Sequence, residues 1–217
     1  MRLITIMNPK GGCGKTTVAT NMAAAFASEG ANVTMVDFDP QGSTIHWLAR
    51  RPEGEPAITG INAAKRGIKS LSDSAVKDAD FVIMDAPAAI RGNALIDLLN
   101  HSETVVIPVL PSPIDIDAAA QFIEQLRRYQ RVKTGHTKLA VIANRAKTNT
   151  LMFDQLEQFL EKTRVPYLTA LRDAQNYNRA YTRGLGVYEL PEYLAWPDWE
   201  QWTPILDWID SRKSQAA

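Results

Sequence analysis

A glycine-rich segment near the N-terminus restricts the fold of this chain more than any other feature. Residues 3–7 form an apolar run, residues 8–17 read Asn-Pro-Lys-Gly-Gly-Cys-Gly-Lys-Thr-Thr, and a helical pattern follows at 17–28. Glycines let backbone N–H groups close around phosphate oxygens, and a helix that starts directly afterwards adds the positive end of its dipole. A strand, a glycine-rich turn and a helix in this order predict a phosphate-binding loop, with a spacing shifted from the simplest consensus.

The residues of this loop have separate predicted roles. Lys15 is expected to face the β- and γ-phosphates of a nucleotide, and the Thr16 hydroxyl is expected to reach Mg²⁺. The loop as a whole supplies backbone N–H groups and one further lysine. The predicted nucleotide-binding residues here are Lys10, Gly11, Gly12, Cys13, Gly14, Lys15, Thr16 and Thr17.

Two aspartate motifs follow at the ends of further apolar runs. Asp37 and Asp39 follow the run 33–36, and Asp85 follows the run 81–84. Ligands in open α/β sheets bind outside the carboxyl ends of the strands. Side-chain alternation would turn Asp37 and Asp39 to the same side if the strand continued that far. Asp85 suits a Walker-B carboxylate, which holds Mg²⁺ through water, whereas a helix cap or turn residue is the alternative for the other two.

The pattern Lys-Gly-Gly-x-Gly-Lys-Thr-Thr, followed by both aspartate motifs, resembles the deviant Walker-A ATPases of the ParA/MinD family, especially short ParA proteins of the ParF and McdA type. The resemblance implies ATP as the nucleotide and a dimer in which Lys10 touches the partner's ATP; a solvated surface lysine is the alternative. It also implies that Asp39 orients the attacking water, with Asp37 nearer the metal. Lys10, Lys15 and Asp39 are therefore the expected catalytic residues, and Thr16 and Asp85 the expected metal ligands. Ala88 departs from the Pro-Pro or Pro-Gly that family members often carry after this last aspartate.

Apolar runs alternate with helical stretches along the chain, which is typical of βα units. With the resemblance, this predicts a three-layer P-loop NTPase fold with a mainly parallel sheet, in one domain spanning 1–217. Expected strands lie at 2–7, 32–37, 80–84, 103–108, 138–144 and 165–170. Expected helices lie at 15–29, 43–50, 61–77, 92–100, 114–130, 151–163, 173–184 and 199–212. Residues 51–60 are expected to form a polar surface connection.

Hydropathy and cysteine content exclude several classes of protein. No apolar stretch of 18 residues occurs, and the N-terminus runs straight into an expected strand, so neither a membrane span nor a signal peptide is expected. Cys13 is the only cysteine, which argues against a disulfide framework and against iron–sulfur relatives of the same fold, and is consistent with the cytoplasm. A redox-sensing thiol is one interpretation of Cys13, and a small residue at a variable position is the other.

Charge is balanced overall but unevenly distributed. Residues 121–190 hold 12 Lys or Arg against 6 Asp or Glu, so this segment is a candidate surface for a polyanion. A solvated cationic helix face is the alternative. The candidate residues for non-specific DNA contacts are Lys162, Arg164, Arg172, Arg179 and Arg183.

Asn144 and Arg145 come directly after the apolar run 139–143, at the end of the expected strand 138–144. Related members suggest that residues at this position contact the adenine or the ribose. DNA or a surface carboxylate is the alternative partner for Arg145.

The C-terminal segment carries an apolar face at helical spacing. Its members are Trp199, Trp202, Leu206 and Ile209. MinD proteins end in an amphipathic helix that binds membranes, and such helices carry Lys or Arg on the polar side. The polar side is acidic here, with Asp198, Glu200, Asp207 and Asp210. Packing of helix 199–212 on the domain's own core is therefore expected, and membrane binding is not.

The resemblance implies a weak, partner-stimulated ATP hydrolase that acts as a timer. An ATP-dependent homodimer would bind non-specific DNA of the nucleoid and position a plasmid, a chromosome or a protein body such as a carboxysome. A ParB-like or McdB-like adaptor would stimulate hydrolysis. A MinD-like ATPase at the membrane surface is the alternative, and a metabolic enzyme with the same fold is a third interpretation.

Overall fold

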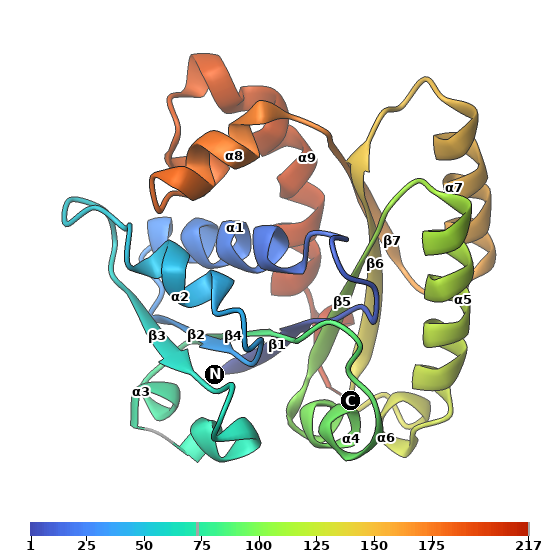
Figure 1. The fold of residues 1–217 in the computed structure, drawn as a ribbon, viewed down its shortest axis with the longest axis horizontal. Helices are drawn as coiled ribbons and strands as arrows, with labels where there is room; N and C mark the ends of the chain where they lie inside the picture. Colours follow the sequence, from blue (N-terminus) through green and yellow to red (C-terminus); the bar gives the residue numbers. More distant parts are fainter. Residues whose placement is uncertain (73, 217) are drawn as a thin grey trace.

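Within residues 1–72 and 74–216, which the computed structural model describes, seven parallel strands form one sheet in the order β3-β2-β4-β1-β5-β6-β7 (Figure 1). The strands are β1 Arg2–Ile6, β2 Val33–Asp37, β3 Ile58–Asn62, β4 Phe81–Asp85, β5 Thr104–Val109, β6 Lys138–Ala146 and β7 Tyr167–Arg172. Because every pair is parallel, all carboxyl ends meet at one edge of the sheet. The expected P-loop architecture is confirmed, with an all-parallel sheet.

Helices cover both faces of this sheet (Figure 1). On one face pack α1 Lys15–Ser28, α2 Ser43–Leu48, α8 Gln175–Thr182 and α9 Glu192–Asp210. On the other pack α3 Ser74–Lys77, α4 Gly92–His101, α5 Pro113–Arg127, α6 Gln130–Lys133 and α7 Leu151–Lys162. Short 3₁₀ helices occupy Gly67–Ser72, Val187–Glu189 and Arg212–Ser214.

The central strands explain why the apolar runs are continuous. Val106 of β5 lies in the core beneath α1, whereas its neighbours Val105 and Ile107 lie in the core on the opposite face. All three are fully buried. A strand that is covered on both faces must be apolar at every position, so it shows no alternation in its sequence.

The region before β4 differs from the expectation. A surface connection was predicted over 51–60 and a helix over 61–77, but β3 lies here as an edge strand, followed by a 3₁₀ helix and the short α3. Gly60 obscures the strand in the sequence. A Cβ at Gly60 would lie 2.4 Å from Leu48 Cδ1, so the glycine allows α2 to pack closely on β3.

Helix α9 begins at Glu192, earlier than the expected 199, and continues through Pro197 and Pro204. Its apolar face packs against the sheet: Trp202, Ile205 and Ile209 are fully buried. The Trp202 indole N–H donates to the Tyr177 hydroxyl at 3.2 Å. Within the described residues, no helix has both the length and the apolar character that crossing a bilayer requires.

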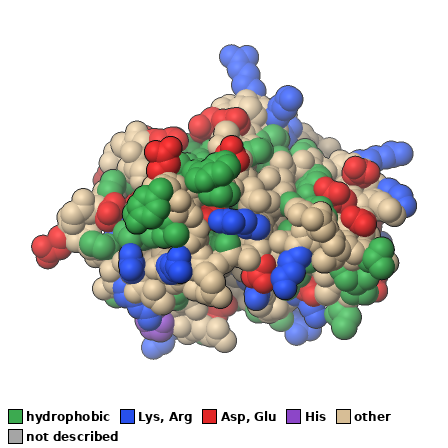
Figure 2. Space-filling view, turned by 90° about the horizontal axis from the view of Figure 1, so that it is seen from above, with side chains coloured by type: hydrophobic (Ala, Val, Ile, Leu, Met, Phe, Trp, Pro, Cys, Tyr) green, Lys and Arg blue, Asp and Glu red, His purple; other side chains and the backbone are tan. Residues whose placement is uncertain are grey.

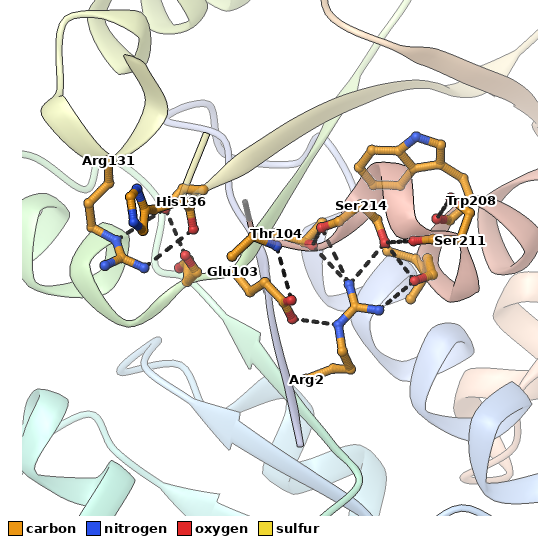
Figure 3. Close-up of polar contacts among 12 residues, drawn as sticks. Arg2, Glu103, Thr104, Arg131, His136, Trp208, Ser211 and Ser214 are labelled. Atoms are coloured by element: carbon orange, nitrogen blue, oxygen red, sulfur yellow. Dashed lines mark hydrogen bonds and ion pairs between the residues drawn. The ribbon is translucent and has the colours of Figure 1, made fainter. Parts of the chain in front are cut away.

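A polar network ties the end of the chain to its beginning, at the amino-terminal edge of the sheet (Figure 3). The Arg2 guanidinium forms an ion pair with Glu103 and donates to the Ile209 carbonyl at 2.6 Å and to Ser214 Oγ at 2.9 Å. The Thr104 hydroxyl donates to the Ser214 carbonyl at 2.7 Å. The last turn of α9 is therefore held against β1 and β5.

Two tryptophans of α9 provide a matched test of this packing. We expect Trp202→Ala to lower the free energy of unfolding by about 3–5 kcal/mol, because it empties a fully buried site. Trp196, which is 50% exposed, is the control, and Trp196→Ala should change stability by less than about 0.5 kcal/mol. Urea unfolding followed by circular dichroism measures both, and equal losses would contradict the observed docking of α9.

Candidate nucleotide-binding site

The phosphate loop is held in shape by its own side chains and by the neighbouring strand. Asn8 is fully buried; its Nδ2 donates to the Pro108 carbonyl at 2.7 Å, and its Oδ1 accepts from the Lys10 N–H at 2.9 Å. The Lys15 side chain is largely buried, and its ammonium donates to the Lys10 carbonyl at 3.0 Å. The ammonium of Lys15 is thus directed across the loop.

Gly14 shows why the last glycine of the loop is required. Its φ of +91° lies in the left-handed region, and a Cβ would lie 2.1 Å from Asn144 Nδ2. That same Nδ2 donates to the Cys13 carbonyl at 2.8 Å. Asn144, at the carboxyl end of β6, therefore braces the phosphate loop directly.

The position of Cys13 argues against the redox-sensing interpretation. Its side chain is fully buried, and its thiol donates to the Lys10 carbonyl at 3.3 Å. Burial raises the pKa of the Cys13 thiol, and nearby Lys15 offsets this only in part. Because the thiolate is the reactive form, this cysteine is a packing residue of the loop.

Asp85 stands at the carboxyl end of β4, opposite Asp37 of β2 and Ile6 of β1. Its Oδ2 accepts hydrogen bonds from the hydroxyls of Thr16 at 2.7 Å and Thr44 at 2.9 Å. Its Oδ1 is buried and has no hydrogen-bond partner within the described chain. Burial raises the pKa of Asp85 to about 7, and the two threonine hydroxyls oppose that rise.

These residues fit a magnesium ion. Mg²⁺ takes oxygen ligands and uses one or two carboxylates together with phosphates and water, so it needs no dense acidic cluster. Within the described residues no group of three or more His, Cys, Asp or Glu forms a metal cage. The unpartnered Asp85 Oδ1 and the adjacent Thr16 hydroxyl are the groups that would hold the ion, directly or through water.

Asp37 and Asp39 do different things, because β2 ends at Asp37 and side-chain alternation does not extend to Asp39. The fully buried Asp37 accepts from the backbone N–H groups of Asp39 at 3.0 Å, Thr44 at 3.0 Å and Ile45 at 3.2 Å. It therefore caps α2, the alternative that the sequence left open. Asp39 is partly exposed, and its Oδ1 accepts from the Gln41 N–H at 2.9 Å.

Two adjoining cavities lie along the phosphate loop. One of about 450 Å³ is lined by loop residues, including Lys15 and Thr16, together with Asp39 and Ala88. The other, of about 180 Å³, also borders the loop. Its lining includes Gly12, Gly14, Thr17, Asn144, Arg145, Asp173 and Tyr177. The arrangement can take a phosphate chain in the first cavity and a nucleoside in the second.

Arg145 lies at the rim of the second cavity. It is exposed, has a left-handed φ of +51°, and pairs with Asp173 at 3.4 Å. This pairing matches one of the alternatives for Arg145 in the sequence interpretation, a surface carboxylate. Lys10 lies on the other side of the loop, along a groove of about 340 Å³ that includes Arg91 and Gln121. Its ammonium makes no hydrogen bond or ion pair within the described chain.

The segment 86–92 is tied to the phosphate loop. Ala89 has a left-handed φ of +55°, and its N–H donates to the Pro9 carbonyl at 2.8 Å. Ala88 is exposed and lines the phosphate cavity. A change at the phosphate end of that cavity can therefore reach this segment through direct contact.

The five candidate DNA contacts do not form one cluster. Lys162 ends α7 and, with Arg164, precedes β7, so both lie toward its amino end; Arg179 and Arg183 follow its carboxyl end. The six residues of β7 span roughly 20 Å. Arg172 pairs with the buried Asp198, donating at 2.6 and 3.0 Å, so its guanidinium is already engaged within the fold.

Asn8, Thr44 and Tyr177 are among the residues at this site that had no role in the sequence interpretation. Asn8 directly precedes the proline of the glycine-rich segment, and that position was its available signal. Thr44 stands seven residues after Asp37, at the start of an expected helix. Tyr177 comes from α8, and no local pattern connects it with the loop.

Asp85 makes the stability of the metal-free protein depend on pH. Its folded-state pKa of about 7 exceeds the ordinary value of 3.8, so the fold favours the protonated form. The contribution of protonated Asp85 to the free energy of unfolding is fully present below the unfolded-state pKa and is lost as pH rises through 7. In EDTA we expect wild-type protein to lose up to about 4 kcal/mol from this source between pH 4 and 8.

Asp85→Asn removes the ionisable group and should flatten this dependence. The pKa of Asp37 is also raised, chiefly by burial, so a smaller fall in the same direction should remain. Urea unfolding at several pH values in EDTA gives both curves. An equally steep fall in the variant would show that Asp85 is not the titrating group.

Comparison with known proteins agrees with this geometry. The family model described as CobQ/CobB/MinD/ParA nucleotide binding domain matches residues 4–187. The chain is 30% identical over 189 residues to the maintenance of carboxysome distribution protein A of Halothiobacillus neapolitanus, covering 86% of this chain and 87% of that protein. It is 27% identical over 216 residues to the chromosome-partitioning ATPase Soj of Thermus thermophilus, covering 82% of this chain and 86% of that protein.

The fold is also found among solved structures. The ATP complex of an Asp-to-Ala variant of McdA from Cyanothece matches with a TM-score of 0.72 at 17% identity, covering 94% of this chain and 96% of that one. At this identity the likeness is one of fold. The extent of the family match, together with the phosphate loop and the two strand-end aspartates, shows that this chain belongs to the CobQ/CobB/MinD/ParA nucleotide-binding family.

Proposed function

We propose that this protein is a ParA-type ATPase that dimerises with ATP, binds DNA without sequence preference and positions a cargo. The observation that carries the proposal is the convergence of Lys15, Thr16 and Asp39 on one cavity, with a second lysine, Lys10, on the outer side of the same loop. Similarity to a carboxysome distribution protein and to a chromosome-partitioning ATPase supports a protein organelle or a DNA molecule as the cargo.

Each residue of the site has a role in this proposal. Lys15 holds the β- and γ-phosphates, and Thr16 and Asp85 hold Mg²⁺, which neutralises phosphate charge when bound. Asp39 lies at the cavity, and its second carboxylate oxygen accepts a hydrogen bond from the attacking water. Lys10 of each protomer extends to the partner's phosphates, where a cation stabilises the charge that develops during transfer.

Cargo positioning also requires partners. An adaptor protein of the ParB or McdB type stimulates hydrolysis in this proposal and so releases the dimer. The ATP-bound dimer resides in the cytoplasm on the nucleoid. Hydrolysis then sets the time that each dimer remains on DNA.

Variants at the site separate ATP binding, dimerisation and hydrolysis. Lys15→Ala should abolish ATP binding, and Lys10→Ala should bind ATP as a monomer. Asp39→Ala should bind ATP and remain dimeric while hydrolysis falls by about 10²-fold or more, because water is no longer oriented. Titration with a fluorescent ATP analogue measures binding, light scattering after size exclusion with ATP and Mg²⁺ measures dimerisation, and phosphate release measures hydrolysis.

The wild-type protein provides the decisive control. If it binds ATP yet remains monomeric at high concentration, with turnover blocked, the dimer mechanism is refuted. Hydrolysis at the wild-type rate in Asp39→Ala would instead remove only the role of that carboxylate.

DNA binding by a single protomer should be weak. Seen from above, Lys and Arg side chains of the described residues lie in small separate groups, with hydrophobic and acidic side chains between them (Figure 2). Arg179 on α8 and Arg183 directly after it are both exposed, and α8 borders the second nucleotide cavity. A dimer that closes over the nucleotides doubles these cations, and affinity for DNA rises with each neutralised phosphate.

Matched double variants test this assignment. We expect Arg179→Ala with Arg183→Ala to weaken DNA binding in the ATP state and to reduce the slope of log K against log salt by about 0.9 per lost contact. Lys162→Ala with Arg164→Ala removes the same charge near the amino-terminal end of β7. This control pair should leave ATP-dependent DNA binding unchanged. Fluorescence anisotropy with duplex DNA over a salt series gives the slopes; a larger loss in the control pair would relocate the DNA surface.

For α9 to serve as a membrane-binding helix, its apolar face would have to be free. The apolar face of α9 is instead buried against the sheet, and Arg2 holds the last turn. We therefore favour DNA over lipid as the surface that the dimer occupies. Flotation with anionic liposomes and ATP distinguishes the two, since binding to lipid but not to DNA would establish the alternative.

A further inference from the structure

We propose that Thr44 is a positioning residue for the Mg²⁺-dependent reaction. Its hydroxyl orients the Asp85 carboxylate. Its backbone N–H binds Asp37, which in turn holds the loop that carries Asp39, so Thr44 connects Asp85 with that loop. The inference rests on the proposed ATPase function. It adds a residue that lies outside both the phosphate loop and the Walker-B strand.

The first contact concerns Asp85. Thr44 is fully buried, and its hydroxyl donates to Asp85 Oδ2 at 2.9 Å, beside the Thr16 hydroxyl at 2.7 Å. The terminal torsion of an aspartate is soft, so a carboxylate with one donor can turn. Two donors on the same oxygen fix the plane of the carboxylate and leave Oδ1 as its open acceptor.

The second contact concerns the loop 39–42. The Thr44 N–H donates to Asp37 Oδ2 at 3.0 Å, and Asp37 Oδ1 accepts from the Asp39 N–H at 3.0 Å. Thr44 therefore binds one strand-end carboxylate through its side chain and the neighbouring one through its backbone. Displacement of Asp85 is transmitted through Thr44 to the residue proposed to position water.

The hydroxyl of Thr44 is not needed to cap α2. Asp37 already accepts from the N–H groups of Thr44 and Ile45, the second and third residues of that helix. A capping hydroxyl ordinarily comes from the N-cap residue, and that position is Gly42 in α2. The Thr44 hydroxyl donates instead to Asp85, which lies at the end of β4, 41 residues later in the chain.

Thr44→Val tests the hydroxyl, because valine keeps the shape and the backbone N–H. We expect equal affinity for a fluorescent ATP analogue in EDTA, but a Mg²⁺ concentration for half-maximal binding raised about 10-fold or more, the usual effect of losing an outer partner of a metal site. Thr44→Ser retains the hydroxyl and should remain close to wild type. In metal-free protein, amides 39–45 should exchange faster in the valine variant alone.

Thr104→Val is the matched control. Thr104 is equally buried and donates to the Ser214 carbonyl at 2.7 Å, but it lies at the opposite edge of the sheet. This variant should leave the Mg²⁺ midpoint unchanged, and thermal unfolding checks that each variant is folded. An unshifted midpoint in Thr44→Val, or an equal shift in Thr44→Ser, would overturn the inference. Absence of nucleotide binding in wild type at every Mg²⁺ concentration would instead refute the proposed function.

Discussion

A carboxylate buried at the end of a central strand is the constraint on which this site depends. Asp85 is 1% exposed, and one of its oxygens has no partner within the described chain. Such a group destabilises a protein unless it is protonated or meets a cation. Its raised pKa shows the first response, and a magnesium ion with a phosphate chain would supply the second. The fold therefore favours binding of Mg²⁺ with a phosphate chain, because without the metal the ionised Asp85 carboxylate is buried with no cation beside it.

Hydrogen bonds connect the loops around Asp85 to one another and to neighbouring strands. Asp37 gathers the backbone of the loop after β2, and Asn144 braces the phosphate loop from β6. The segment after β4 is attached to Pro9 through Ala89. Three loops from separate strands thus share hydrogen bonds around one cavity. A nucleotide bound in this cavity would therefore act on all three loops through short polar contacts.

The positions of the phosphate loop after β1 and of Asp85 at the end of β4 agree with the expected strands. The phosphate loop and Asp85 lie at the ends of apolar runs, and their neighbours determine their positions through strand geometry. Edge strand β3 was not predicted, because Gly60 and the exposed residues beside it do not show the pattern of a buried strand. The split of the basic residues was equally hidden, since Arg164 and Arg179 are close in the chain but separated by the length of β7.

The sequence by itself determined the order of βα units, the glycines that allow a phosphate loop, and the aspartates at strand ends, because these depend on local geometry and on burial of short apolar runs. The tertiary structure decided which side chains meet. It brought Thr44 to Asp85 and turned Asp37 into a helix cap. It also engaged Arg172 with Asp198 and covered the apolar face of α9. These outcomes depend on which strands become neighbours, and that choice is made by packing across the whole sheet.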